Sequence, residues 1–209
     1  MKRLLSAALL ALVATVANSA VIYNNGNPDI QNGYPIGGST YTADDFTIVA
    51  GGTVRSVGFY FQNYQGITGW DNAISYGIYA DTAGAFGSQL ASGSGLNVTP
   101  TLSSFPWCCG GGNAWLVEFD LQSDFVAAAG TTYWLSLSGA GGSSPWWVTA
   151  PLNGLYSSIS SGGTIWGTDV AFYLSDDTIG NGGNVPEPGS LALLGLGLAG
   201  LAALRHRRT

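Results

Sequence analysis

Histidine and lysine are nearly absent from this sequence, which contains one of each, His206 and Lys2. The chain upstream of residue 206 therefore has no imidazole for a Ser-His or Cys-His pair and no histidine to bind a metal. Beyond residue 2 it has no lysine to act as a general base or to form a Schiff base. These absences exclude most hydrolytic mechanisms, and we expect a protein that is not an enzyme.

Positive charge is equally scarce in the central part of the chain. Between residues 21 and 185, Arg55 is the only cationic residue and faces eleven acidic residues, a net charge of −10. Nucleic acids and anionic membrane surfaces are bound through clustered Lys and Arg, so the central part is not expected to bind either. Divalent cations and neutral polymers remain compatible with this charge.

Cysteine is limited to two adjacent residues, Cys108 and Cys109. Neighbouring Cα atoms lie about 3.8 Å apart, below the usual range for a disulfide. We expect a vicinal disulfide, with two free thiols or bonds to another molecule as the alternatives, and we assign no function to it.

Both ends of the chain have the pattern of targeting segments. Residues 1–20 have a basic start, an apolar run and a small-residue end, which is typical of a secretory signal peptide cleaved after Ser19 or Ala20. Residues 189–204 contain only Gly, Ser, Leu and Ala, and we expect them to form a single transmembrane helix. These 16 residues would reach about 24 Å, somewhat less than a bilayer core of about 30 Å. A buried core helix is the alternative.

The apolar run follows Pro186, Glu187 and Pro188, and it ends in the basic residues Arg205, Arg207 and Arg208. This order resembles the PEP-CTERM sorting signal of Gram-negative bacteria. The resemblance implies that an exosortase recognises the chain in the membrane and cuts near the Pro-Glu-Pro segment. It further implies export to the cell surface or the extracellular matrix.

Between the targeting segments we expect one all-β domain, residues 21–175, and a polar linker, residues 176–185. Apolar and polar residues alternate with a period of two in short segments that glycines separate. On one segment, Val57, Phe59 and Phe61 share a face. The alternating segments are residues 57–62, 74–79, 115–121, 133–138 and 170–174. This pattern favours an antiparallel β-sandwich, for which we expect a jelly-roll-like strand order.

Four strand-like pieces of this domain are similar to an uncharacterised β-sandwich module of PEP-CTERM surface proteins. They are residues 43–48, 53–57, 78–81 and 130–136. The resemblance supports the fold more than any function.

Carboxylates provide two candidate sites. Glu118 and Asp120 fall on one face of the 115–121 strand, about 7 Å apart, a separation that a glycosidase pair could use. The alternative is a solvated strand face. Two pairs of adjacent aspartates supply the hard oxygens that a structural calcium ion takes, or they are ordinary turn and strand-end residues. These pairs are Asp44, Asp45, Asp176 and Asp177.

Several tryptophans fall in or beside the predicted loops, where no strand face buries them automatically. Aromatic rings there suit stacking against sugars, although they could instead cap the ends of the sandwich. The loop tryptophans are Trp70, Trp107, Trp146, Trp147 and Trp166. Of these, Trp107, Trp146 and Trp147 are our candidates for carbohydrate contact.

We therefore expect a non-catalytic, exosortase-sorted protein of the cell surface or matrix that contacts exopolysaccharide. No cofactor is expected apart from the calcium considered above. The alternatives are a carbohydrate-active enzyme that uses a carboxylate pair and a purely structural matrix protein.

Overall fold

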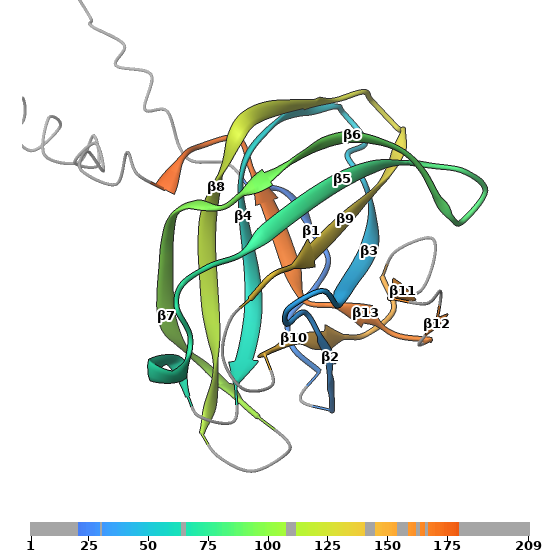
Figure 1. Ribbon diagram of the computed structural model, residues 1–209. Coiled ribbons are helices and arrows are strands. Elements are labelled where there is room, and N and C mark those ends of the chain that lie inside the picture. Colours follow the sequence, from blue (N-terminus) through green and yellow to red (C-terminus); the bar gives the residue numbers. More distant parts are fainter. Residues whose placement is uncertain are drawn as a thin grey trace, which may run out of the picture. The chain divides into compact units, whose positions relative to one another are not determined.

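Figure 1 shows a computed structural model of the chain. The structure describes residues 21–29, 31–63, 66–107, 112–140, 145–153, 159–161, 164–165 and 167–179. They belong to one compact unit, Ser19–Gly183. The predicted signal peptide, the Pro-Glu-Pro segment, the 189–204 helix and the two cysteines lie outside the described residues. Within the described ranges, no helix is long and apolar enough to cross a membrane.

The larger of two antiparallel sheets is built around the two longest strands of the described part, β4 and β8 (Figure 1). On one side of this pair the sheet continues through β14 to β1, and on the other side through β7. A shorter group of strands, β10, β2 and β13, joins the sheet at the end of β4. The strands are β1 (Val21–Asn24), β2 (Gly33–Pro35), β4 (Gly52–Asn63), β7 (Leu96–Pro106), β8 (Asn113–Ala127), β10 (Pro145–Ala150), β13 (Asp169–Val170) and β14 (Phe172–Ser175).

The second sheet has the order β12-β11-β3-β9-β5-β6. Its strands are β3 (Tyr41–Thr47), β5 (Ser75–Asp81), β6 (Phe86–Ser94), β9 (Thr132–Ser138), β11 (Ile159–Ser160) and β12 (Thr164–Ile165), and a 3₁₀ turn, η1 (Ile67–Gly69), follows β4. The prediction of an all-β fold with two antiparallel sheets is confirmed. The jelly-roll order stays a prediction.

The core lies between the two sheets and fixes which face of each strand points outward. Val57, Phe59 and Phe61 of β4 are fully buried in this core together with Val117 and Phe119 of β8. Ile78 of β5 and Leu135 of β9 enter the same core from the second sheet. Side chains alternate along a strand between its two faces. Residues 58, 60 and 62 of β4 therefore point to the outer face of the larger sheet.

Four predicted segments, 57–62, 74–79, 115–121 and 133–138, lie on β4, β5, β8 and β9, and the fifth, 170–174, is divided between β13 and β14. The alternation did not predict β1, β2, β3, β6, β7, β10, β11 or β12. Of these, β3 was covered by the resemblance through residues 43–48. Glycines were expected to separate the strands, but Gly93 lies within β6 and pairs with Tyr76, so that expectation is wrong for Gly93. Gly95 lies at the junction between β6 and β7.

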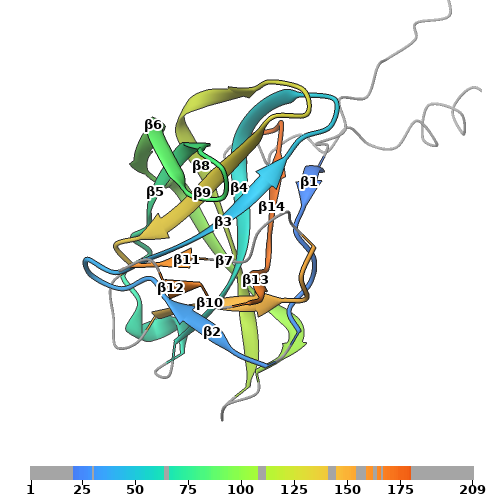
Figure 2. The same ribbon diagram turned by 90° about the vertical axis from the view of Figure 1, so that its right-hand side faces the viewer.

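The first and last strands of the described part lie side by side at one edge of the larger sheet. Figure 2 shows β1 next to β14. Val21 pairs with Ser175, and Asn24 pairs with Tyr173. The chain therefore enters and leaves the larger sheet at the same end of the β1–β14 pair.

Candidate functional site: the outer face of the larger sheet

Tyr173 lies across the outer face of the larger sheet. Gly58 on β4 is the register partner of both Tyr173 on β14 and Glu118 on β8, so the three residues form one row across three strands. A Cβ atom at Gly58 would lie 2.2 Å from Cζ and 2.3 Å from Cε1 of Tyr173. The Tyr173 ring therefore occupies the space above the glycine, and its hydroxyl donates a hydrogen bond to Oε1 of Glu118. We call Gly58, Glu118 and Tyr173 the tyrosine platform.

Both tyrosines near Glu118 keep their protons over the ordinary pH range. Burial, and then the hydrogen bond to Glu118, raise the pKa of Tyr173 above its ordinary value. Burial, and then the charge of Glu118, raise the pKa of Tyr60. Tyr173 already donates its one hydroxyl proton to Glu118, so the platform offers acceptors, namely the Glu118 carboxylate and the Tyr173 hydroxyl oxygen. The neighbouring Tyr60 hydroxyl can donate.

A second, smaller apolar cluster covers the same face farther along β4. Trp107, Ala114 and Val148 are buried together, and Tyr60 packs against them. The Tyr60 ring also meets the edge of Phe105, with the ring centroids 5.3 Å apart. Tyr60 thus connects the tyrosine platform to the tryptophan cluster.

The structure separates the three tryptophans that the sequence suggested for carbohydrate contact. Trp146 and Trp147 lie in β10 near its start, so they are strand residues and not loop residues. Trp147 is completely buried, packs against Phe59 and Phe172, and donates its indole N–H to the carbonyl of Ala171 at 2.9 Å. It belongs to the core and cannot reach a ligand. Trp146 is partly exposed and points to the outer face.

Trp107 follows the last residue of β7 and is only 7% exposed. Trp70 is also buried, since its ring lies against Phe61 and its indole N–H is bonded to the carbonyl of Ala73. Trp166 lies outside the described residues. Of the predicted candidates, only Trp107 and Trp146 remain beside the outer face.

Glu118 and Asp120 follow the expected alternation on β8, but their surroundings differ. Glu118 is half-buried beneath Tyr173. Asp120 is 4% exposed, and its carboxylate accepts hydrogen bonds from Nδ2 of Asn97 at 2.7 Å and from the backbone N–H of Ile179. The expectation that both lie on a solvated strand face is therefore wrong for Asp120, because residues from β7 and from the chain beyond β14 cover it.

Asp44 lies in the interior of β3 and forms part of a buried polar cluster. Its Oδ2 accepts from Nδ2 of Asn25 at 2.9 Å and from the backbone N–H of Val170 at 2.7 Å. Burial, and then the charge of Asp169, raise the pKa of Asp44 well above its ordinary value. The neighbouring Asp45 is also buried in β3.

These placements bear on the predicted calcium site. Asp44 and Asp45 are neither turn nor strand-end residues, and Asp176 and Asp177 follow β14 beside Arg55. The described part of the chain contains no group of three or more His, Cys, Asp or Glu side chains that could hold a metal ion. The structural calcium ion stays a prediction.

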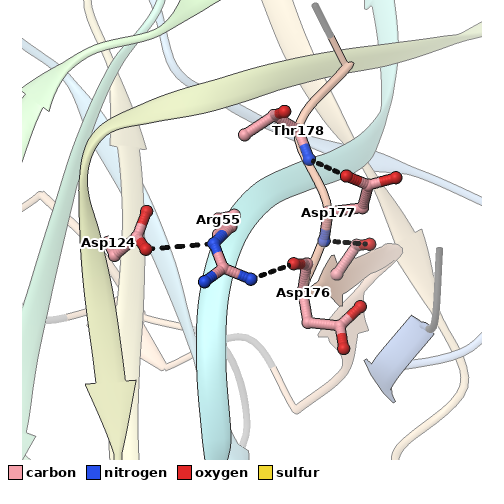
Figure 3. A network of polar contacts seen from close by, with 6 residues as sticks. Arg55, Asp124, Asp176, Asp177 and Thr178 are labelled. Carbon is pink, nitrogen blue, oxygen red and sulfur yellow. Dashed lines mark hydrogen bonds and ion pairs between the residues drawn. The ribbon is translucent and has the colours of Figure 1, made fainter. Parts of the chain in front are cut away.

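Arg55 on β4 contacts both Asp124 of β8 and the backbone of Asp176, which follows β14 (Figure 3). Its Nε pairs with Oδ2 of Asp124 at 3.0 Å, and its Nη1 donates to the backbone carbonyl of Asp176 at 2.6 Å. Farther along, the N–H of Ile179 is bonded to Asp120. The ordered domain therefore extends into the first residues of the segment that the sequence assigned to a linker.

We expect the Arg55→Ala variant to release residues 176–179 while the core stays folded. An exposed ion pair contributes at most about 1 kcal/mol, so the melting temperature should fall little, whereas amide hydrogen exchange at Thr178 and Ile179 should accelerate. The Asp124→Ala variant is the matched control, because it removes the ion pair and leaves the bond to the Asp176 carbonyl. Unchanged exchange in Arg55→Ala would show that Arg55 does not hold this segment.

Sequence reasoning missed most residues of the outer face. Tyr173, Gly58 and Tyr60 were placed on strands, but only as the polar side of an alternating pattern. That Tyr173 lies opposite Gly58 cannot be recognised from the sequence, because it depends on the pairing of β4 with β14. The available signal was the aromatic Tyr60 on a face expected to be polar.

Comparison with protein-family models finds the PEP-CTERM protein-sorting motif at residues 184–208. The expected resemblance is confirmed: the chain carries a C-terminal signal that an exosortase recognises, and this signal directs export to the cell envelope or surface of Gram-negative bacteria. No curated protein and no solved structure matches the chain.

Proposed function

We propose that this exosortase-sorted protein presents a non-catalytic β-sandwich that contacts neutral exopolysaccharide through the outer face of its larger sheet. The PEP-CTERM motif supports the exported location. The tyrosine platform supports the contact. Before sorting, residues 189–204 would hold the precursor in the membrane, and cleavage near Pro186–Pro188 would leave the domain at the cell surface or in the matrix.

The observation that carries the proposal is the position of the Tyr173 ring over Gly58. A ring that lies over a glycine in a strand turns its other side away from the sheet, and the partial exposure of Tyr173 leaves that side accessible. Sugar rings present apolar C–H groups that pack against aromatic rings, while their hydroxyls bond to polar groups at the edge. Glu118 and Tyr60 supply such groups beside Tyr173.

The charges of the described residues favour a neutral glycan over an acidic one. Arg55 is the only cationic residue between residues 21 and 185, and it is engaged by Asp124 and the Asp176 carbonyl. No described cation is left to pair with a uronate or a sulfate, and Glu118 would repel either. Hydroxyl groups can both donate to Glu118 and accept from tyrosine.

The same surroundings favour binding over catalysis. A glycosidase pair needs one carboxyl that donates a proton and one that acts as base or nucleophile. Asp120 is occupied by Asn97 and Ile179, and Glu118 accepts from Tyr173. Tyr173 keeps its proton because its pKa is raised, so it is a poor nucleophile.

The test is binding of the mature domain to a panel of neutral and acidic polysaccharides. Tyr173→Ala should reduce binding to a neutral polysaccharide by about tenfold or more, the equivalent of about 1.4 kcal/mol. Tyr79→Ala is the matched control, because Tyr79 is a half-buried outer-face tyrosine on β5 of the other sheet. Absence of binding in the wild type, or equal loss in both variants, would refute the contact. Release of reducing sugar that Glu118→Gln abolishes would favour the carbohydrate-active enzyme instead.

A further inference from the structure

Gln62, Trp107 and Trp146 meet on the outer face at the far end of β4. Gln62 and Trp146 are cross-strand partners, next to the core-facing pair Phe61 and Trp147. Alternation therefore turns both Gln62 and Trp146 outward. A Cβ atom at Gly33 would lie 3.0 Å from Cβ of Trp146 and 3.1 Å from Cη2 of Trp107. Both tryptophans thus flank the same glycine.

Each of the three side chains has a buried polar atom that no hydrogen bond within the described structure satisfies. These atoms are Oε1 of Gln62, Nε1 of Trp107 and Nε1 of Trp146. Gln62 is 4% exposed, so its amide oxygen is well shielded. Buried polar groups in native proteins are almost always bonded. Two donors and one acceptor, around the Gln62–Trp146 pair and Gly33, are therefore unsatisfied by the chain itself, so their partner is an ordered water or a ligand.

We propose that Gln62, Trp107 and Trp146 form a second subsite, and that the outer face binds an internal stretch of one linear, neutral polysaccharide chain. Gln62 lies four positions after Gly58 on β4, which corresponds to about 13 Å along the strand. This inference rests on the function proposed above. It adds the class of ligand: a polysaccharide chain long enough to reach both the tyrosine platform and the second subsite. Hydroxyl groups complement the three atoms, since each can accept from an indole N–H or donate to the amide oxygen.

Tyr60 lies between the two subsites on the outer face of β4. Tyr60 packs against the cluster that contains Trp107, and its ring touches Phe105. Tyr60 lies two positions after Gly58 on the same face of β4, next to the tyrosine platform. Tyr60 is partly exposed, so it offers an aromatic step on which an intermediate sugar ring can pack. A bound chain would therefore run along β4.

The experiment is calorimetric titration of the mature domain with neutral linear glucan oligosaccharides of two to six residues. For the wild type, affinity should rise by roughly tenfold between the shortest and longest oligosaccharides, as expected when new hydrogen bonds are made. In Gln62→Ala and in Trp146→Phe, which keeps the aromatic ring but removes the N–H, affinity should no longer rise with length. Gln89→Ala, on exposed β6, is the matched control and should behave as the wild type.

Other outcomes would refute the second subsite, the proposed function or the neutral ligand class separately. If affinity is independent of length while Tyr173→Ala still abolishes binding, the second subsite is refuted and the proposed function stands. If no oligosaccharide binds the folded wild type, the proposed function fails with it. Equal binding of an oligogalacturonate refutes the neutral ligand class. A dimer in sedimentation equilibrium that Trp146→Phe dissolves would show that the face binds a second copy of this chain. Thermal melting of each variant excludes unfolding as the cause of a loss.

Discussion

The Gly58→Ala variant should lose glycan binding as completely as Tyr173→Ala does, although it adds only one methyl group. That methyl would lie 2.2 Å from Cζ of Tyr173, so the ring must leave its place over β4 and give up its bond to Glu118. Overpacking of this kind costs typically about 1–3 kcal/mol. Thermal melting with titration of a neutral polysaccharide measures both effects.

Two further variants distinguish a clash with the Tyr173 ring from the loss of stability that alanine could cause at any glycine of a strand. Gly77→Ala is the matched control, because its added Cβ would lie 2.7 Å from Cε2 of Tyr79 on the other sheet. It should destabilise the domain and leave glycan binding intact. In the double variant Gly58→Ala with Tyr173→Ala, the cost of the alanine should disappear, since the ring that it strikes is gone. An undiminished cost in the double variant would contradict the contact.

On β4, the local sequence was sufficient to predict which residues share a face of the strand. Phe59 and Phe61 were correctly assigned to one face, which leaves Gly58, Tyr60 and Gln62 on the other, because side chains alternate along a strand whatever pairs with it. What each face contacts depends on partners that lie far away in sequence. Tyr173, 115 positions after Gly58, supplies the ring, and the register that brings it there is set by the β4–β14 pairing.

The missed strands and the misplaced tryptophans have a common physical reason. β6 and β7 are rich in Ser, Thr, Gly and Pro, and their pattern of exposure shows few buried positions. They pair through the backbone and have little apolar surface to alternate. In β10 both Trp146 and Trp147 are large and apolar, so period two is not visible in the letters. Only pairing with β4 separates the outward residue from the core residue.

The burial of Asp44 could not be predicted from the local sequence. Adjacent aspartates in a sequence of low charge predict an exposed turn or an ion site, because a buried carboxylate is costly without partners. For Asp44 the partners are Asn25 and the backbone of Val170, from both ends of the domain. No local pattern joins residues 25, 44 and 170. The polar cluster exists only once β3 and β13 have met.

Raising the pH should destabilise the domain through Asp44. An aspartate titrates near pH 3.9 in the unfolded chain, whereas burial and then Asp169 raise the pKa of Asp44 in the folded domain. Between these two pKa values the folded state holds a proton that the unfolded state has released. The free energy of unfolding should therefore fall as pH rises through this window, by up to about 1.4 kcal/mol per pH unit for one proton. Urea unfolding between pH 4 and pH 8 measures the slope.

The Asp44→Asn variant should flatten this dependence, because its amide cannot ionise. One backbone N–H, that of Asp45 or that of Val170, would then face the amide nitrogen, so a loss of about 1–3 kcal/mol at all pH values is expected. The groups that face Asp44 are Asp45, Asp169 and Tyr23, and none is a cation that could stabilise its charge. Asp71→Asn, on an exposed turn, is the matched control and should keep the wild-type slope. If Asp44→Asn also keeps that slope, the proton is held elsewhere, and the carboxyl of Asp169 is the next group to replace, because it shares the buried cluster.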